Sequence, residues 1–197
     1  MPIDRLDFHN LGEGDLAELV AGQVREGLRI EYKRDLYGNA DQDKREALED
    51  ISAFANAFGG HLILGIEAHQ GIPVALPGLP GANPDDTILW FEQLTQSGIE
   101  PRIQGLRVRA VRLANSAHCV VLRVPKSWYP PHRVSAQNSN RYWIRNSGGV
   151  HEASMEEMDR VRQFRDDRIN LITDGAIRMI TIPRVPSIAI VFICPRA

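Results

Sequence analysis

The sequence lacks several features that mark secreted, membrane-spanning or metal-bound proteins. Only two cysteines occur in 197 residues, Cys119 and Cys194, and their wide separation fits no metal-ligand spacing. The N-terminus has no positively charged head followed by an apolar run, so we expect no signal peptide. No apolar run approaches the ~20 residues that cross a bilayer, and the longest, residues 188–194, is typical of one strand. We therefore expect a soluble cytoplasmic protein with free buried thiols and no membrane contact.

Motifs for several common kinds of chemistry are also absent. The sequence contains no G-x-x-x-x-G-K-[ST] phosphate loop and no G-x-S-x-G nucleophile turn, and its six histidines form no H-x-x-x-H pair. The glycine pair Gly59-Gly60 follows an apolar helical stripe instead of preceding a helix. We interpret it as a left-handed helix cap, so no ATP motif is found and a zinc site is not expected.

Acidic residues are missing from one segment of the chain. Residues 101–151 hold nine Lys and Arg and no Asp or Glu, whereas residues 1–100 hold 18 acidic and seven basic residues. Residues 152–197 hold seven of each, so the formal net charge of −2 hides a strong segregation. Where the basic segment faces solvent it forms a positively charged surface, which attracts polyanions.

Apolar residues at helical spacing and capping residues predict the helices. The clearest stripe occupies residues 47–58 and ends at the glycine pair. Asn83-Pro84 followed by two aspartates predicts the start of a helix that ends near Gly98. Capping-box patterns predict two more helix starts, at Asp15 with Glu18 and at Ser154 with Glu157.

Alternation and β-branched content predict the strands. Residues 28–36 alternate, with Leu28, Ile30 and Tyr32 toward the core and charged residues outward. Further strands are predicted at residues 61–66, 106–113, 118–125, 141–145 and 182–193, and a loop at residues 68–82. These elements predict an α+β fold with a mixed, largely antiparallel sheet and packed helices. We expect one domain over residues 1–165, followed by an extension or a further unit at residues 166–197.

Two segments carry a resemblance to a known family. Residues 26–33 read Glu-Gly-Leu-Arg-Ile-Glu-Tyr-Lys, and residues 51–67 hold the apolar helix, the glycine pair and the next strand. Together they resemble the Schlafen AlbA_2 family, over about residues 15–164. The resemblance implies a single AlbA_2-like lobe that handles nucleic acids, and some members of the family cut RNA.

The resemblance also implies a set of carboxylates. In Schlafen-type nucleases the catalytic acids are two glutamates of an E-x-x-x-x-E-F-K-like motif and an aspartate that closes a G-V-x-D-like motif. Glu26, Glu31 and Lys33 match the first motif, but Ala68 occupies the aspartate position, beside Glu67. The resemblance thus implies Glu26 and Glu31 as ligands of Mg²⁺ or Mn²⁺, Glu67 as a third catalytic candidate, and Lys33 beside the scissile phosphate. The alternative is a charged strand face that is merely solvated.

The basic segment holds the strongest signal for nucleic-acid binding. Alternation places Arg141, Trp143 and Arg145 on one strand face, which we expect to face solvent, and Tyr142 and Ile144 toward the core. Arginine pairs with phosphates, and an exposed tryptophan offers a stacking platform. The candidate nucleic-acid-binding residues are Lys126, Trp128, Arg133, Arg141, Trp143 and Arg145. The alternative is a basic sheet face neutralised by the acidic first hundred residues.

These observations favour binding of DNA or RNA through the basic, aromatic-bearing sheet region, as a module of a larger bacterial regulatory or defence protein. Schlafen-type cores contain two lobes around a positively charged groove. Because this chain holds one lobe, the resemblance implies a homodimer. The first alternative is a Mg²⁺- or Mn²⁺-dependent endoribonuclease that uses Glu26, Glu31 and Glu67. The second alternative is a regulatory or oligomerisation module that binds an acidic protein partner.

Overall fold

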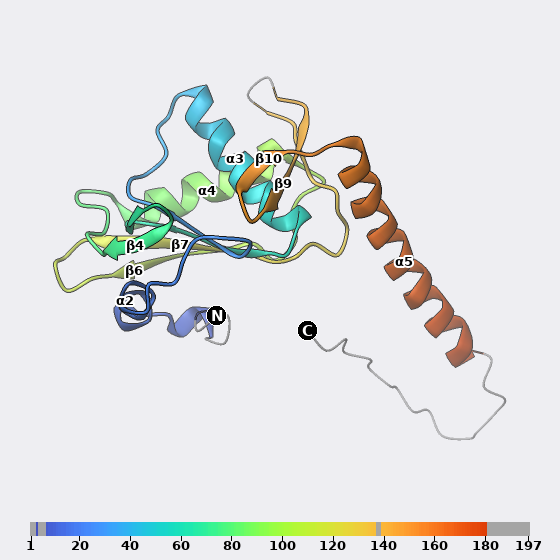
Figure 1. The fold of residues 1–197 in the computed structure, drawn as a ribbon, viewed down its shortest axis with the longest axis horizontal. Coiled ribbons are helices and arrows are strands. Elements are labelled where there is room, and N and C mark those ends of the chain that lie inside the picture. Colours follow the sequence, from blue (N-terminus) through green and yellow to red (C-terminus); the bar gives the residue numbers. More distant parts are fainter. Residues whose placement is uncertain (1–2, 4–6, 137–138, 181–197) are drawn as a thin grey trace.

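The central sheet has four strands and is mixed. The structure, a computed structural model, describes residues 3, 7–136 and 139–180 (Figure 1). In sheet order the strands are β1 (Ile30–Lys33), β2 (Gly60–Leu64), β7 (His118–Val124) and β6 (Arg107–Arg112). β1 pairs with β2 in parallel, and the other two pairs are antiparallel. The predicted α+β fold with a mixed, largely antiparallel sheet is confirmed.

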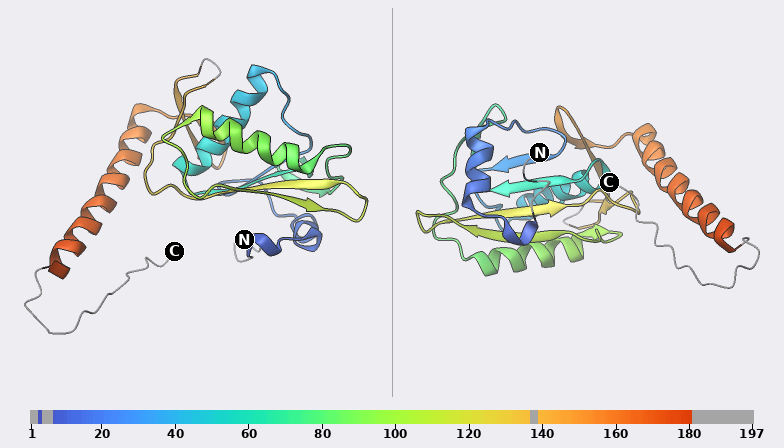
Figure 2. Two further views of the ribbon diagram at one scale, coloured as in Figure 1. Left: turned by 180° about the vertical axis from the view of Figure 1, so that it is seen from behind. Right: turned by 90° about the horizontal axis from the view of Figure 1, so that it is seen from below.

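Helices cover both faces of this sheet. α3 (Asp41–Asn56) and α4 (Pro84–Gly98) lie on one face, and η1 (Phe8–Asn10) and α2 (Glu13–Ala21) lie on the other (Figure 2). Leu62 and Leu64 of β2 belong to the first core, and Ile63 belongs to the second. A strand that is buried on both faces has a nearly continuous apolar sequence, which is why this strand is recognisable from sequence.

A smaller antiparallel sheet packs against α3. Its strands, in sheet order, are β10 (Gly149–Glu152), β9 (Arg141–Asn146), β8 (Arg133–Val134) and β5 (Ile99–Glu100). Asn56 at the end of α3 joins the two parts, because its Nδ2 donates to the carbonyl oxygens of His132 and Trp143, both at 2.9 Å. Its Oδ1 accepts from the His132 backbone nitrogen at 2.7 Å. These buried hydrogen bonds hold the second sheet on the end of the helix.

Two of the three predicted helix starts are confirmed. The third is wrong, because α2 begins at Glu13 with Gly12 as its N-cap, and Asp15 accepts a hydrogen bond from the Gly12 backbone nitrogen at 2.8 Å. Asn83 caps α4, and Ser154 and Glu157 exchange two hydrogen bonds at the start of α5 (Met155–Ile180). Gly59, after α3, has a φ of +68°, and a Cβ at this position would clash with the backbone nitrogen of Lys126. The glycine pair is thus a helix cap at a close approach of two backbone segments, as predicted.

The predicted loop at residues 68–82 is wrong in part, because a hairpin begins there. β3 (Glu67–His69) and β4 (Ile72–Ala75) are joined by Gln70 and Gly71, whose φ angles are +52° and +75°. Positive φ at both turn residues is typical of two-residue hairpins, since it matches the twist of the strands. The three prolines of residues 68–82 favour a loop when they are considered alone. However, Pro73 lies in a two-stranded sheet, in which each strand has an unpaired edge that tolerates proline.

α5 runs without a break through residue 165, where a domain boundary was predicted. The helix leaves the body of the molecule and points away from the sheet (Figure 1). The predicted extension therefore begins inside a helix that continues to Ile180. The predicted strand at residues 182–193 lies outside the described residues.

The described residues bear on two further expectations, one about membrane-spanning segments and one about the two cysteines. Among the described helices, none combines the length and the apolar character needed to cross a membrane. Cys119 is a buried free thiol, as predicted, and burial raises its pKa to about 12. Cys194 lies outside the described residues.

Candidate nucleic-acid interface

The β9 face that was expected to meet solvent is the face that packs on α3. Arg141, Trp143 and Arg145 share one side of the strand, as alternation predicts. However, Arg145 is only 4% exposed and Trp143 packs against the core. The expectation of an exposed Trp143–Arg145 face is therefore wrong. A period of two shows which residues share a face, whereas the helix that covers that face is decided by tertiary packing.

Arg145 is neutralised inside the protein. Its Nε donates to the Gly27 carbonyl oxygen at 2.7 Å, and its Nη2 donates to the Ile30 carbonyl oxygen and pairs with the Glu31 carboxylate. The guanidinium carbon lies 4.5 Å from the centre of the Phe54 ring. A buried charge is costly unless it is paired and hydrogen-bonded. Arg145 therefore ties β9 to β1 and is not displayed to a ligand from solvent.

Two other predicted arginines, the half-buried Arg133 and the exposed Arg141, are paired with carboxylates. Arg133 Nη2 lies 2.6 Å from a carboxylate oxygen of Glu100, and Arg141 Nη1 lies 2.8 Å from one of Glu152. Such surface pairs add little to stability, yet each carboxylate competes with a phosphate for its arginine. At these two positions the basic segment is neutralised. The alternative interpretation named the acidic first hundred residues as the source, which holds for Glu100 but not for Glu152.

Two of the predicted catalytic carboxylates face one cavity. Glu26 and Glu31 line a cavity of about 400 Å³, together with Arg25, Arg145 and a glycine pair at residues 148–149. Glu26 lies before β1 and its Oε1 accepts a hydrogen bond from the backbone nitrogen of Tyr32 at 2.8 Å. The bend before β1 thus brings both glutamates to one side, although Glu31 is already paired with Arg145.

Neither of the other two predicted catalytic residues lines this cavity, although Lys33 Nζ lies 3.9 Å from Glu31 Oε1. Lys33 turns toward α3, with its Nζ 2.7 Å from Glu46 and 3.1 Å from Asp50. Burial opposes the charge of Lys33, but Asp50 and Glu46 outweigh it and raise the lysine pKa. Glu67 pairs with Arg34 at 3.6 Å and with His69 at 3.2 Å, and within the described chain it does not line the glutamate cavity.

The glutamate cavity fits a divalent cation only in a limited way. The described residues contain no group of three or more His, Cys, Asp or Glu side chains placed to hold a metal. Magnesium can bind through one or two carboxylates plus phosphate oxygens of the substrate. Glu26 and Glu31 meet that smaller requirement, whereas a site made by three protein carboxylates is not formed.

A different surface collects cations and exposed rings. The segment after β7 lies beside α5, and these two segments, together with Phe58 after α3, form what we term the Lys126 patch. Its residues are Phe58, Lys126, Trp128, Tyr129, Phe164, Arg165 and Arg168. The exposed fractions of Phe58, Trp128 and Tyr129 are 45%, 55% and 58%. Of the predicted binding residues, only Lys126 and Trp128 belong to this patch.

Lys126 has no carboxylate partner in the described chain, whereas Arg165 of the same patch pairs with Asp166 at 2.9 Å. Lys126 Nζ lies 4.0 Å from the centre of the Phe164 ring and 5.6 Å from that of Phe58, and no described carboxylate forms an ion pair with it. Burial lowers the lysine pKa, and the positive charges of Arg168 and Arg29 lower it further. An ammonium among rings and other cations is a favourable place for an anion.

Sequence reasoning missed five members of the patch. Phe58 and Phe164 lie on apolar helical stripes and were expected in the core. Tyr129 was expected only to border the basic surface, and Arg165 and Arg168 were not singled out. A usable signal was present, because residues 160, 164 and 168 recur at helical spacing as Arg, Phe and Arg. The missing information was that α5 lies along the loop that follows β7.

The fold and these sites are those of a small α+β module with a basic, aromatic interface. The family model described as Schlafen, AlbA_2 matches residues 26–154, and the chain belongs to this family. Lys126 and Trp128 lie within the match, whereas Phe164 and Arg168 on α5 lie beyond it. Among curated proteins, none matches this chain.

Two solved structures are similar. The protein DIP2311 from Corynebacterium diphtheriae is 17% identical, with a TM-score of 0.49, and the match covers 77% of this chain and 29% of that one. The N-terminal domain of a RecG-related protein from Nitrosomonas europaea is 24% identical, with a TM-score of 0.48, and the match covers 71% of this chain and 90% of that domain. This chain thus spans less than a third of the first of these proteins.

Proposed function

We propose that this chain binds nucleic acid through the Lys126 patch. The observation that carries the proposal is the state of Lys126, an ammonium held by two rings and near Arg168 and Arg29, without a carboxylate partner in the described chain. Nucleic acids supply both a phosphate charge and flat base faces, and the patch offers groups for each. Membership of the Schlafen AlbA_2 family is consistent with a ligand of this class.

The proposal replaces the predicted surface with a neighbouring one. Trp143 and Arg145 are withdrawn into the core, and Arg133 and Arg141 are paired with glutamates. Lys126 retains an unbalanced charge. The binding free energy is therefore expected to depend on this residue more than on the arginines of β8 and β9.

Fluorescence anisotropy with labelled DNA and RNA tests the proposal. Lys126→Ala and Arg168→Ala are each expected to weaken binding by about tenfold and to reduce the salt dependence by about one counterion. Arg141→Ala is the matched control, because it removes the same charge from an ion-paired position. No salt-sensitive binding at all would overturn the proposal and would favour an acidic protein as the partner.

A second candidate function is a metal-dependent endoribonuclease. It is favoured by one observation, that Glu26 and Glu31 line the same cavity together with Arg25 and Arg145. Bound Mg²⁺ or Mn²⁺ would supply Lewis-acid polarisation of a phosphodiester. Glu26 and Glu31 would hold the ion, and Arg25 would offer a positive charge to the substrate. Lys33 is not expected to contribute, because Glu46 and Asp50 already hold it.

Incubation of labelled transfer RNA with Mn²⁺ or with EDTA tests this candidate. Cleavage that requires the metal and disappears in Glu31→Gln would support it. Glu67→Gln serves as the matched control, since Glu67 lies outside the cavity. Cleavage that persists in Glu31→Gln, or none with any metal, would contradict it. Because Glu31 also pairs with Arg145, the melting temperature of each variant must be compared with that of the parent.

We also propose that the chain acts as a module of a larger bacterial regulatory or defence protein and forms a homodimer. This proposal rests on the two-lobed Schlafen-type core that the resemblance implies. Light scattering coupled to gel filtration tests it, and a mass equal to one chain at micromolar concentration would contradict the dimer.

A further inference from the structure

Rings and cations of the Lys126 patch alternate in space. Phe58 and Phe164 both lie beside the Lys126 ammonium, and Phe164 and Trp128 both lie beside the Arg168 guanidinium. The Arg168 guanidinium carbon is 3.5 Å from the centre of the Trp128 ring and 5.1 Å from that of Phe164. The contacts therefore define a row of ring, cation, ring, cation and ring, which runs from the end of α3 along α5.

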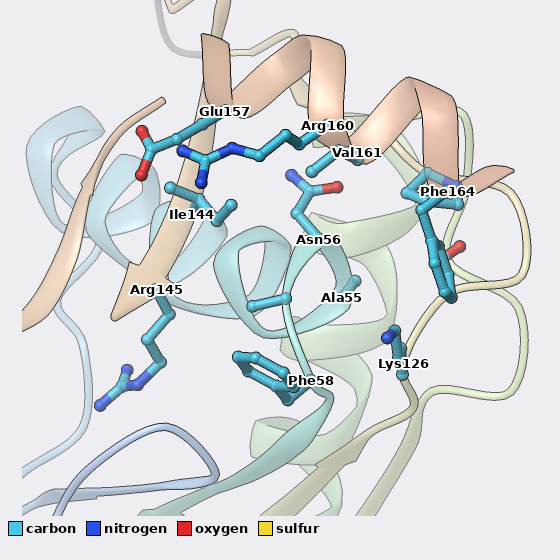
Figure 3. A pocket seen from close by; sticks show the side chains of 13 residues that line it. Ala55, Asn56, Phe58, Lys126, Ile144, Arg145, Glu157, Arg160, Val161 and Phe164 are labelled. Carbon is cyan, nitrogen blue, oxygen red and sulfur yellow. The ribbon is translucent and has the colours of Figure 1, made fainter. Parts of the chain in front are cut away.

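A cavity of about 260 Å³ opens beside this row. Phe58, Val161 and Phe164 form much of its apolar wall, and Lys126 and Arg160 contribute positive charge (Figure 3). In the close view, Phe164 extends from α5 toward Lys126, and Phe58 approaches from the segment after α3. Pockets for drug-sized molecules hold roughly 300–1,000 Å³, so this one has room for a single planar ring system.

Several uncharged polar groups that line the cavity are already hydrogen-bonded within the protein. Both atoms of the Asn56 amide bond to the backbone of His132 and Trp143. Ser127 Oγ accepts from the Tyr129 backbone nitrogen at 3.0 Å and lies 2.6 Å from His132 Nε2. The Glu157 carboxylate also lines the cavity, and its oxygens bond to His151 and to the Ser154 backbone nitrogen. A ligand in this cavity therefore finds apolar faces, cations and one carboxylate, but few free groups that could read the hydrogen-bonding edge of a base.

We propose that the Lys126 patch binds single-stranded nucleic acid, with one unstacked base in the cavity against Phe58 and Phe164. A neighbouring base stacks on Trp128, and backbone phosphates lie near Lys126 and Arg168. The proposal rests on the proposed function and adds the class of substrate. In a duplex the base faces cover each other, so only a single strand offers them to protein rings. Because stacking replaces edge recognition, affinity is expected to vary little with base identity.

Three labelled probes of equal length separate this inference from general nucleic-acid binding. They are oligothymidylate, the same strand annealed to oligoadenylate, and a chain of abasic deoxyribose phosphates. The single strand is expected to bind at least about fivefold more tightly than either of the others, since stacking contributes about 1–3 kcal/mol per base. Equal affinity for all three would overturn the inference and leave nucleic-acid binding intact. Binding of none would instead remove the proposed function.

Ring-removing variants place the effect at the cavity. Phe58→Leu and Phe164→Leu keep apolar volume but remove the ring. Each is expected to lower the affinity for the single strand about fivefold and to leave the affinity for the abasic chain unchanged. Leu171→Ala is the control, since Leu171 is an exposed residue of α5 that does not line the cavity. Equal loss for both probes would overturn the inference, because only phosphate contacts would then have changed.

Tryptophan fluorescence provides a measurement that does not depend on those variants. Titration with oligothymidylate is expected to quench emission by stacking on Trp128, and the quenching is expected to be lost in Trp128→Leu. The abasic chain is expected to leave the emission unchanged. Quenching that survives in Trp128→Leu would contradict the stacking at this position, because Trp90 and Trp143 would then be the reporters.

Discussion

The glutamate cavity and the Lys126 patch both contain basic side chains, but they use them differently. In the cavity, Arg145 is buried, pairs with Glu31 and bonds to two backbone carbonyls. In the patch, Lys126 lies among aromatic rings and other cations. The comparison teaches that the position of a basic residue in the sequence does not show whether its charge serves the fold or a ligand. The nearest carboxylate and the exposure decide it.

The largest effect is expected from breaking the buried pair. Arg145→Met leaves the Glu31 carboxylate and the Gly27 carbonyl without their donor, so the free energy of unfolding is expected to fall by about 3 kcal/mol. Urea denaturation measures this change. Arg141→Met is the control, because Arg141 lies on the same face of β9 but is exposed. This substitution is expected to lower the free energy of unfolding by less than about 1 kcal/mol. Equal losses would show that burial of the pair carries no special weight.

The next effect concerns the patch. Lys126→Glu places a carboxylate beside Arg168 and Arg29 and neutralises the local charge. The affinity for single-stranded DNA is expected to drop by about tenfold or more, while the free energy of unfolding stays the same or rises. Lys126→Glu is thus expected to lower the affinity without lowering the stability, whereas the effect predicted for Arg145→Met is a loss of stability. A marked loss of stability would mean that Lys126 serves the fold as well.

A smaller effect is expected from pH. Burial, Arg168 and Arg29 lower the pKa of Lys126, so its charge is lost at a lower pH than that of an ordinary lysine. Affinity is therefore expected to fall as the pH rises from about 7 toward about 10, the ordinary lysine range. Lys126→Arg keeps its charge throughout and is expected to show a flatter profile in the same anisotropy titration. Parallel profiles would exclude Lys126 as the titrating group.

The smallest effect is expected from the paired surface arginines. Arg133→Ala and Arg141→Ala each remove a charge that a glutamate already balances, so the affinity is expected to change by less than about twofold. Anisotropy titrations at one salt concentration measure this change. A tenfold loss of affinity for either variant would contradict this expectation and would favour the arginines of β8 and β9 as the binding residues.

Local sequence chemistry was sufficient for most of the fold. The stripe before Gly59, the cap at Asn83 and the paired cap at Ser154 and Glu157 are signals whose physical cause lies within a few residues. They are confirmed. The hairpin at residues 67–75 was missed, because its stability comes from pairing and a two-residue turn, whereas its proline favours a loop when considered alone.

The candidate sites were less predictable. The resemblance implied Glu26 and Glu31 as a pair, and they share a cavity. Residues five apart on a regular strand face opposite sides, so the bend before β1 is what brings the two glutamates together. Lys126 and Trp128 were singled out from the basic segment, although their role stays a prediction. Trp143 and Arg145 were assigned to the wrong environment, because alternation carries no information about which face a helix covers.

The sequence alone determined most of the elements, the family pattern and the charge segregation, since each depends on neighbouring residues or on composition. Tertiary structure decided which charges are neutralised and which rings stay open. Arg145 meets Glu31 across 114 positions of sequence, and Lys126 meets Phe164 only because α5 lies beside the loop after β7. Electrostatic and stacking energies depend on distance in space, which the order of residues does not contain.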